Sequence, residues 1–150
     1  MKYTTLRGEE TAISFDLACV MRMTDGCTTL AEVMGEAHEA GLMASANATP
    51  IPMIVEQHVN PLDDSSKVVQ RWTVPAGACG FAWVNIRGLR GKMREAVKWF
   101  GFRANDYERA MQRWVHEFNQ SAALKAAYAG AFAEVLRKHG FKASSGDRLD

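Results

Sequence analysis

The sequence predicts an α+β fold, in which an N-terminal helical hairpin joins a small, mostly antiparallel sheet covered by helices. Three observations lead to this expectation. Apolar residues recur at helical spacing in the stretches 11–23, 29–40 and 121–139. Short runs rich in β-branched and aromatic residues, bounded by proline and glycine, lie between the second and third stretches. The length of 150 residues is close to the usual size of one domain, so a single core is expected over 1–150.

The helices are predicted from their buried faces and their ends. Residues 11–23 are expected to form the first helix, which would stop at the turn signal Asp25-Gly26. The second begins at a capping box, Thr29-x-x-Glu32, and stops at Gly41. The longest runs over 121–139, with Ser121 as its cap and Gly140 at its end. A short helix is expected at 92–100, and residues 43–52 are expected to be a connector.

Strands are predicted at 53–59, 68–74 and 81–86, where β-branched and aromatic residues gather between turns. The tail 141–150 is expected to hold a last short strand. The segment 105–118 is open: its apolar residues fit one face of a helix, and a strand is also compatible with them.

Charge divides the chain into two parts. Residues 1–66 carry 3 Lys/Arg and 10 Asp/Glu, a net charge of −7, while residues 67–150 carry 15 Lys/Arg and 7 Asp/Glu, a net charge of +8. We therefore expect an acidic hairpin at 11–41 and a basic α+β core at 49–150. The two parts can attract each other within one fold or present separate faces to different partners.

Several classes of protein are not indicated. Three cysteines without Cys-x-x-Cys spacing argue against a disulfide framework, and four scattered histidines give no zinc pattern. No metal or other cofactor is expected. No apolar run approaches the ~20 residues of a membrane span, and residues 1–5 lack the apolar stretch of a signal peptide.

One string and the segments after it carry a resemblance. Cys79-Gly80-Phe81-Ala82-Trp83-Val84 is followed by a basic segment, a tyrosine-containing segment, Gln-Ser before an alanine-rich helix, and a terminal Arg-Leu-Asp. Those later pieces are 92–100, 107–115, Gln120-Ser121, 126–136 and Arg148-Leu149-Asp150. In this order they resemble a family of small, uncharacterised proteins of tailed bacteriophages. The resemblance spans about residues 49–150.

Two positions depart from that family's pattern. It has Tyr-Gly-Gly where this chain has Tyr107-Glu108-Arg109, and a serine where this chain has Asp147. The resemblance favours a strand within 105–118. It implies a phage origin, in the virion or the host cytoplasm, and names no reaction.

Cys79 is the first candidate site residue, because it lies between a glycine-rich turn and a predicted strand. A cysteine nucleophile needs a base within hydrogen-bond reach. His58 or His116 would be that base, and Asn85 or Asp106 would orient it. The competing interpretation, which we favour, makes Cys79 a small buried residue of the core.

The basic stretch 87–113 is the second candidate site, because cations neutralise phosphates and aromatic rings stack on exposed bases. Its candidate binding residues are Arg87, Arg90, Lys92, Arg94, Lys98, Trp99 and Arg103. The alternatives are a solvated helix face and a docking surface for the acidic hairpin. The isoelectric point of 7.8 is below that of most nucleic-acid-binding domains.

Three functions follow, and we favour the first. It is a non-enzymatic phage protein, either a small structural component of the virion or an accessory factor that binds phage or host proteins. The second is a cysteine-dependent hydrolase or transferase that uses Cys79. The third is a nucleic-acid-binding module that uses 87–113. No membrane partner is expected, and the sequence holds no convincing catalytic set.

Overall fold

The structure is a computed structural model that describes residues 2–4, 10–12, 28–118 and 120–150. Strands β1 (Lys2–Thr4) and β2 (Glu10–Ala12) pair antiparallel. The prediction of a helix over 11–23 is wrong at its first two residues, because Thr11 and Ala12 belong to β2 and pair with β1. The rest of that predicted helix lies outside the described residues.

Helix α2 (Leu30–Asn47) begins at the predicted capping box. The Thr29 side chain accepts from the Glu32 backbone N–H at 3.2 Å, and the Glu32 carboxylate accepts from the Thr29 backbone N–H at 2.7 Å. The predicted stop at Gly41 is wrong, because the helix continues to Asn47. A Cβ at Gly41 would lie 2.5 Å from the ring of Tyr128, so glycine here serves close helix packing. The predicted connector is accordingly shorter and begins at Ala48.

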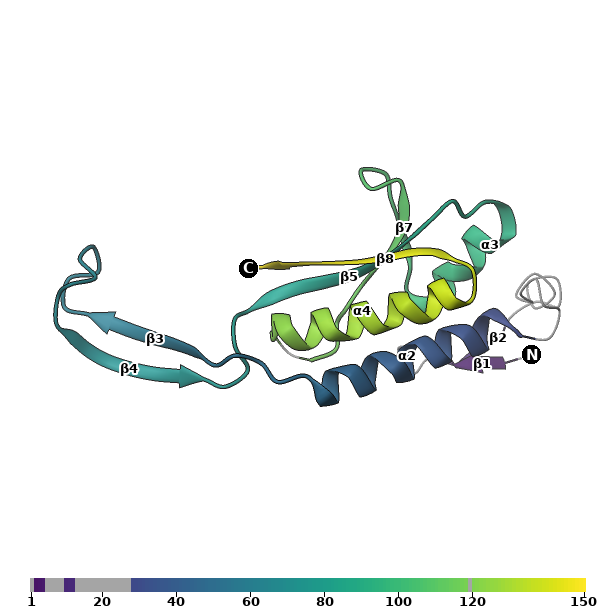
Figure 1. The fold of residues 1–150 in the computed structure, drawn as a ribbon. Helices are drawn as coiled ribbons and strands as arrows, with labels where there is room; N and C mark the ends of the chain where they lie inside the picture. Colours follow the sequence, from purple (N-terminus) through teal and green to yellow (C-terminus); the bar gives the residue numbers. More distant parts are fainter. Residues whose placement is uncertain (1, 5–9, 13–27, 119) are drawn as a thin grey trace.

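Strands β3 (Met53–His58) and β4 (Val68–Val74) pair antiparallel and form a hairpin, as their sequence patterns predict. This hairpin extends away from the rest of the molecule (Figure 1). We call residues 51–75 the arm. Pro52 and Pro75 flank its two strands, where a missing N–H costs no ladder hydrogen bond.

A four-stranded antiparallel sheet in the order β6-β7-β5-β8 forms the centre of the fold. Its strands are β5 (Gly80–Arg87), β6 (Arg103–Asn105), β7 (Ala110–Trp114) and β8 (Lys142–Leu149). The open prediction for 105–118 is thus resolved towards a strand over 110–114. Helix α3 (Gly91–Ala96) and the 3₁₀ helix η1 (Val97–Phe100) connect β5 to β6, where one helix over 92–100 was predicted.

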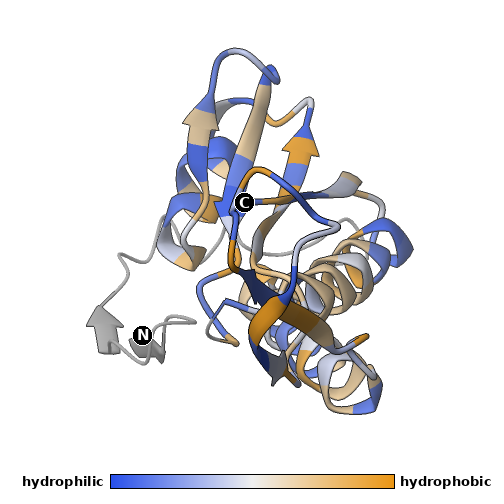
Figure 2. Cartoon of the chain, turned by 90° about the vertical axis from the view of Figure 1, so that its left-hand side faces the viewer, coloured by the Kyte–Doolittle hydropathy of each residue, from blue (hydrophilic) through white to orange (hydrophobic). Residues whose placement is uncertain are grey.

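Helix α4 (Ala122–Lys138) lies against β5 and β8, and α2 lies against α4, so the described core has three layers (Figure 1). Ser121 accepts from the Leu124 N–H as the predicted cap, and Gly140 has a φ of 85° after the helix end. In Figure 2 the packed helices are largely pale orange with blue segments between, and deeper orange appears on strands. The α+β prediction is confirmed.

Candidate functional site

The two faces of the central sheet differ in their environment. Alternate residues of β5, namely Ala82, Val84 and Ile86, are buried in the core with α4. The residues between them, Phe81, Trp83, Asn85 and Arg87, therefore point to the opposite face. Helix α4 packs on the core side of β5 and β8, and α2 packs on α4, so neither of these two helices covers the opposite face. At the start of β5, Lys125 of α4 lies 5.7 Å from the Phe81 ring centroid.

Strand register identifies the other residues of this opposite face, which we call the open face. Gln112 and Trp114 of β7 pair with Asn85 and Trp83, while Ser144, Gly146 and Arg148 of β8 pair with Asn85, Trp83 and Phe81. Arg103 of β6 pairs with Gln112, so it lies on the same face. The open face consists of Phe81, Trp83, Asn85, Arg87, Arg103, Asn105, Ala110, Gln112, Trp114, Lys142, Ser144, Gly146 and Arg148.

Three aromatic rings form a contiguous cluster on the open face. The Trp83 and Trp114 centroids are 5.2 Å apart, and the Phe81 and Trp114 centroids are 5.9 Å apart in an edge-to-face arrangement. Trp114 keeps 37% of its surface exposed. Gly146 lies beside the Trp83 indole, where a Cβ would approach within 2.7 Å. The cluster therefore depends on glycine in the neighbouring strand.

Cations surround this aromatic cluster. The Arg148 guanidinium lies 5.5 Å from the Phe81 ring centroid, within cation–π range. Arg87 donates to Ser144 at 3.1 Å and pairs with Glu108 at 2.7 Å. Arg103 donates to the carbonyls of Lys98 and Phe102 at 3.0 and 2.9 Å. Two of these three arginines are thus held by the protein, while Arg148 has no carboxylate partner in the described part of the chain.

A hollow of ≈ 350 Å³ lies at the β6–β7 side of the open face. Its lining is mostly polar and consists of Gly101, Arg103, Ala104, Asn105, Asp106, Gln112, Trp114 and His116. Asn105 donates to Gln112 at 3.0 Å, which fixes both amides in the wall. Amide, imidazole and guanidinium groups beside an indole can bind a flat, polar ligand through its edge and its face.

Asn85 adds an unsatisfied group to the same face. The residue is only 4% exposed, and its Oδ1 has no hydrogen-bond partner among the described residues. Its strand neighbours are Gln112 and Ser144. A buried acceptor without a donor costs on the order of 1–3 kcal/mol.

The residues of the predicted cysteine site lie on separate elements. Cys79 is exposed, so the prediction of a buried core residue is wrong; its backbone forms a bridge to Ser121 at the edge of the sheet. His58 ends β3, five residues out along the arm, which is about 17 Å from the arm's base. Its Nδ1 is 2.8 Å from the Ser66 carbonyl. His116 lines the hollow with the predicted orienter Asp106, while Asn85 lies within the sheet.

The predicted basic site is divided between two surfaces. Arg87 and Arg103 lie on the open face, whereas Arg90, Lys92 and Arg94 lie at and around the start of α3. Lys98 pairs with Glu95 at 2.7 Å. Glu95, Lys98, Trp99 and Arg103 line a second hollow of ≈ 370 Å³. Arg113, part of the same stretch, is buried below Tyr128 and Phe132 and pairs with Glu117 at 2.7 Å.

The aromatic cluster and Arg148 were not predicted as a site. The signal was present in 81–87, where large and small residues alternate and Phe81, Trp83 and Arg87 share one parity. Trp114 and Arg148 lie 31 and 65 residues after Trp83 in the chain. Only their pairing with β5 brings them to the same face.

No family model, no curated protein and no solved structure matches this chain. Among the residues that the structure describes, no group of three or more His, Cys, Asp or Glu side chains is arranged to hold a metal ion. None of the described helices has the length and apolarity needed to span a bilayer.

Proposed function

We propose that the open face binds single-stranded nucleic acid, with Phe81, Trp83 and Trp114 as the stacking surface. The observation that carries the proposal is their contiguous cluster on a sheet face that neither α2 nor α4 covers. Every base has a flat π-face, so such rings hold single strands with little regard to sequence. Sheets that bind RNA in this way stack two or three bases on their aromatic residues.

Cations at the edges of the cluster supply the phosphate contacts. Arg148 lies beside Phe81, Arg87 and Lys142 are directly opposite each other across β5 and β8, and Arg103 is on β6. Four such contacts would give a log–log salt dependence of roughly −3 for a single strand. This is a modest electrostatic contribution, in keeping with an isoelectric point of 7.8.

The hollow beside Trp114 suits the polar edge of a stacked base. Gln112 and His116 line it together with Trp114. Amide and imidazole groups form hydrogen bonds with base edges that are accessible only when the base is unpaired. A duplex buries those edges and stacks its bases on one another, so it should bind this face much more weakly than a single strand.

The test is a titration of the protein into a fluorescein-labelled single strand, with fluorescence anisotropy as the readout, at several salt concentrations. The strand has about 12 nucleotides, a length within the usual site sizes of single-strand-binding folds. Trp114→Ala should weaken binding by about 5- to 150-fold, because base–aromatic stacking contributes about 1–3 kcal/mol. Arg148→Ala should reduce the salt slope by about 0.7. Circular dichroism would confirm that both variants remain folded.

Trp72→Ala is the matched control. Trp72 is an exposed tryptophan on the arm and does not belong to the open face. This variant should bind like the wild type. Equal losses in both tryptophan variants, equal affinity for a duplex, or binding that is insensitive to salt would each overturn the proposal.

The two other functions suggested by the sequence, a virion component and a cysteine-dependent enzyme, are tested separately. Detection of the chain by mass spectrometry in purified particles would support a virion component, and its absence would remove that version. A cysteine-dependent activity requires that Cys79→Ser abolish turnover, and the placement of His58 far out on the arm leaves Cys79 without that base. Phage origin itself stays a prediction.

A further inference from the structure

The arm is a surface without a partner inside the described part of the molecule. Strands β3 and β4 contact each other and make no comparable contact with any other described element. A two-stranded hairpin on its own is only marginally stable in water. Its exposed apolar residues are numerous: Ile51, Ile54, Val59, Leu62, Val69 and Trp72. In Figure 2 the arm points towards the viewer and carries orange segments.

The tip of the arm combines apolar and acidic groups in a fixed shape. Leu62 is 96% exposed and is followed by Asp63 and Asp64, with no Lys or Arg in 59–66. Asn60 accepts from the Leu62 N–H at 3.1 Å, and Asp63 accepts from the Ser65 N–H at 2.9 Å. These bonds hold the loop, so it meets a partner at little cost in conformational entropy.

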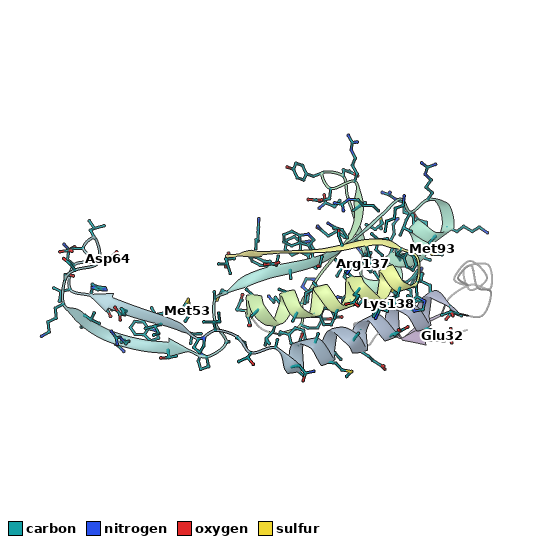
Figure 3. The ribbon with its side chains drawn as sticks, viewed as in Figure 1. Glu32, Met53, Asp64, Met93, Arg137 and Lys138 are labelled. Atoms are coloured by element: carbon teal, nitrogen blue, oxygen red, sulfur yellow. The ribbon has the colours of Figure 1, made fainter. Side chains whose placement is uncertain are left out.

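The opposite end of the molecule has the complementary character. Arg90, Lys92 and Arg94 gather there without an acidic residue in 88–94, and none of the three has an ion-pair partner in the described part of the chain. Leu89 and Met93 lie among them and are partly buried against the core. Figure 3 labels Asp64 and Met93 at the two ends of the molecule. We call residues 88–94 the basic end.

We propose that the arm tip of one molecule docks on the basic end of a second copy of this chain. The arm tip is acidic, the basic end is positively charged, and both carry apolar side chains. The two surfaces lie at opposite ends of the molecule, so they cannot meet within one copy. A contact between two different surfaces of the same chain is heterologous. It therefore builds a ring or an open filament rather than a simple two-fold dimer.

This association is independent of nucleic-acid binding, because neither the tip nor the basic end includes a residue of the open face. The association is measured by sedimentation velocity of the full chain without nucleic acid. Protein concentrations from about 1 to 200 μM cover the dissociation constants expected for a weak, salt-sensitive contact. We expect species larger than the 16.6 kDa monomer that increase with protein concentration and decrease with added salt. A wild-type chain that stays monomeric over this range overturns the proposal.

Charge exchange tests the pairing. Asp63→Lys with Asp64→Lys gives a basic tip, and Arg90→Glu with Lys92→Glu and Arg94→Glu gives an acidic end. Each variant alone should associate at least about tenfold more weakly, since like charges then face each other. An equal mixture of the two should associate again, because the basic tip of one meets the acidic end of the other.

The mixture is the decisive measurement, because mixing would not restore association if either variant were misfolded. Glu134→Lys, an exposed change on α4, is the control and should associate like the wild type. Association that survives both exchanges, or variants that stay apart when mixed, would show that the copies meet elsewhere.

Discussion

Gly41 should be the position in α2 where alanine is most damaging. A Cβ there would lie 2.5 and 2.7 Å from Cδ2 and Cε2 of Tyr128. Carbon atoms pack best at about 3.5–4.0 Å, so the ring or the helix would have to move by about 1 Å. Tyr128 is fully buried, and its hydroxyl is 2.6 Å from His38 Nδ1. The ring also packs against Phe132, with centroids 5.7 Å apart.

The magnitude follows from two opposing terms. Overpacking of a fixed core site costs about 1–3 kcal/mol, and the immobile ring places Gly41→Ala near the upper value. Replacement of glycine by alanine inside a helix returns about 1 kcal/mol. The net effect is a loss of about 2 kcal/mol in the free energy of unfolding, the difference between those two terms. For a chain of this length the melting temperature should fall by roughly 4–8 °C.

Gly35→Ala is the matched control within the same helix. No described atom lies within 4 Å of a Cβ at Gly35, so only the propensity term remains. This variant should gain up to about 1 kcal/mol. Urea unfolding with an unchanged m-value would measure both effects. If Gly41→Ala proves as stable as Gly35→Ala, then α2 and α4 do not pack as described.

Four further outcomes are expected. Glu117→Gln should cost about 2 kcal/mol at neutral pH, because it leaves the buried Arg113 guanidinium unpaired. Burial works to raise the pKa of Glu117, but Arg113 and backbone hydrogen bonds lower it below 4.5. The stability that the Arg113–Glu117 pair contributes is therefore present above pH 4.5 and is lost as the pH falls through the pKa of Glu117 in the folded state. In urea titrations at acid pH, the variant and the wild type should consequently have similar free energies of unfolding. Arg109→Gly should raise stability by about 1 kcal/mol in thermal melts, because Arg109 has a φ of 50°, and an unchanged melt would count against that turn. Thr29→Ala should lower stability by about 1 kcal/mol through loss of the capping box, and urea unfolding at the wild-type midpoint would contradict that cap. Cys79→Ser should change stability by less than about 0.5 kcal/mol, and Cys79 should be alkylated in the native protein; protection from alkylation would contradict its exposure.

Local sequence predicted the elements whose signals are local. The capping box at Thr29, the Ser121 cap and Gly140 all act within a few residues, and the structure confirms each of them. Strand β4 was predicted with its observed bounds, because it ends against Pro75. The end of α2 was missed because Gly41 looks like a stop signal in sequence, whereas its role depends on a ring 87 residues away.

The sequence by itself thus determined the α+β class, the starts of α2 and α4, the arm strands and the division of charge along the chain. Tertiary structure decided which side chains share a surface. Trp83, Trp114 and Arg148 meet because β5 pairs with both β7 and β8, and register is a property of the whole sheet. It also exposed Cys79, divided the basic stretch between two surfaces and left the arm uncovered by any described element. Each of these depends on contacts between distant residues, which local periodicity does not encode.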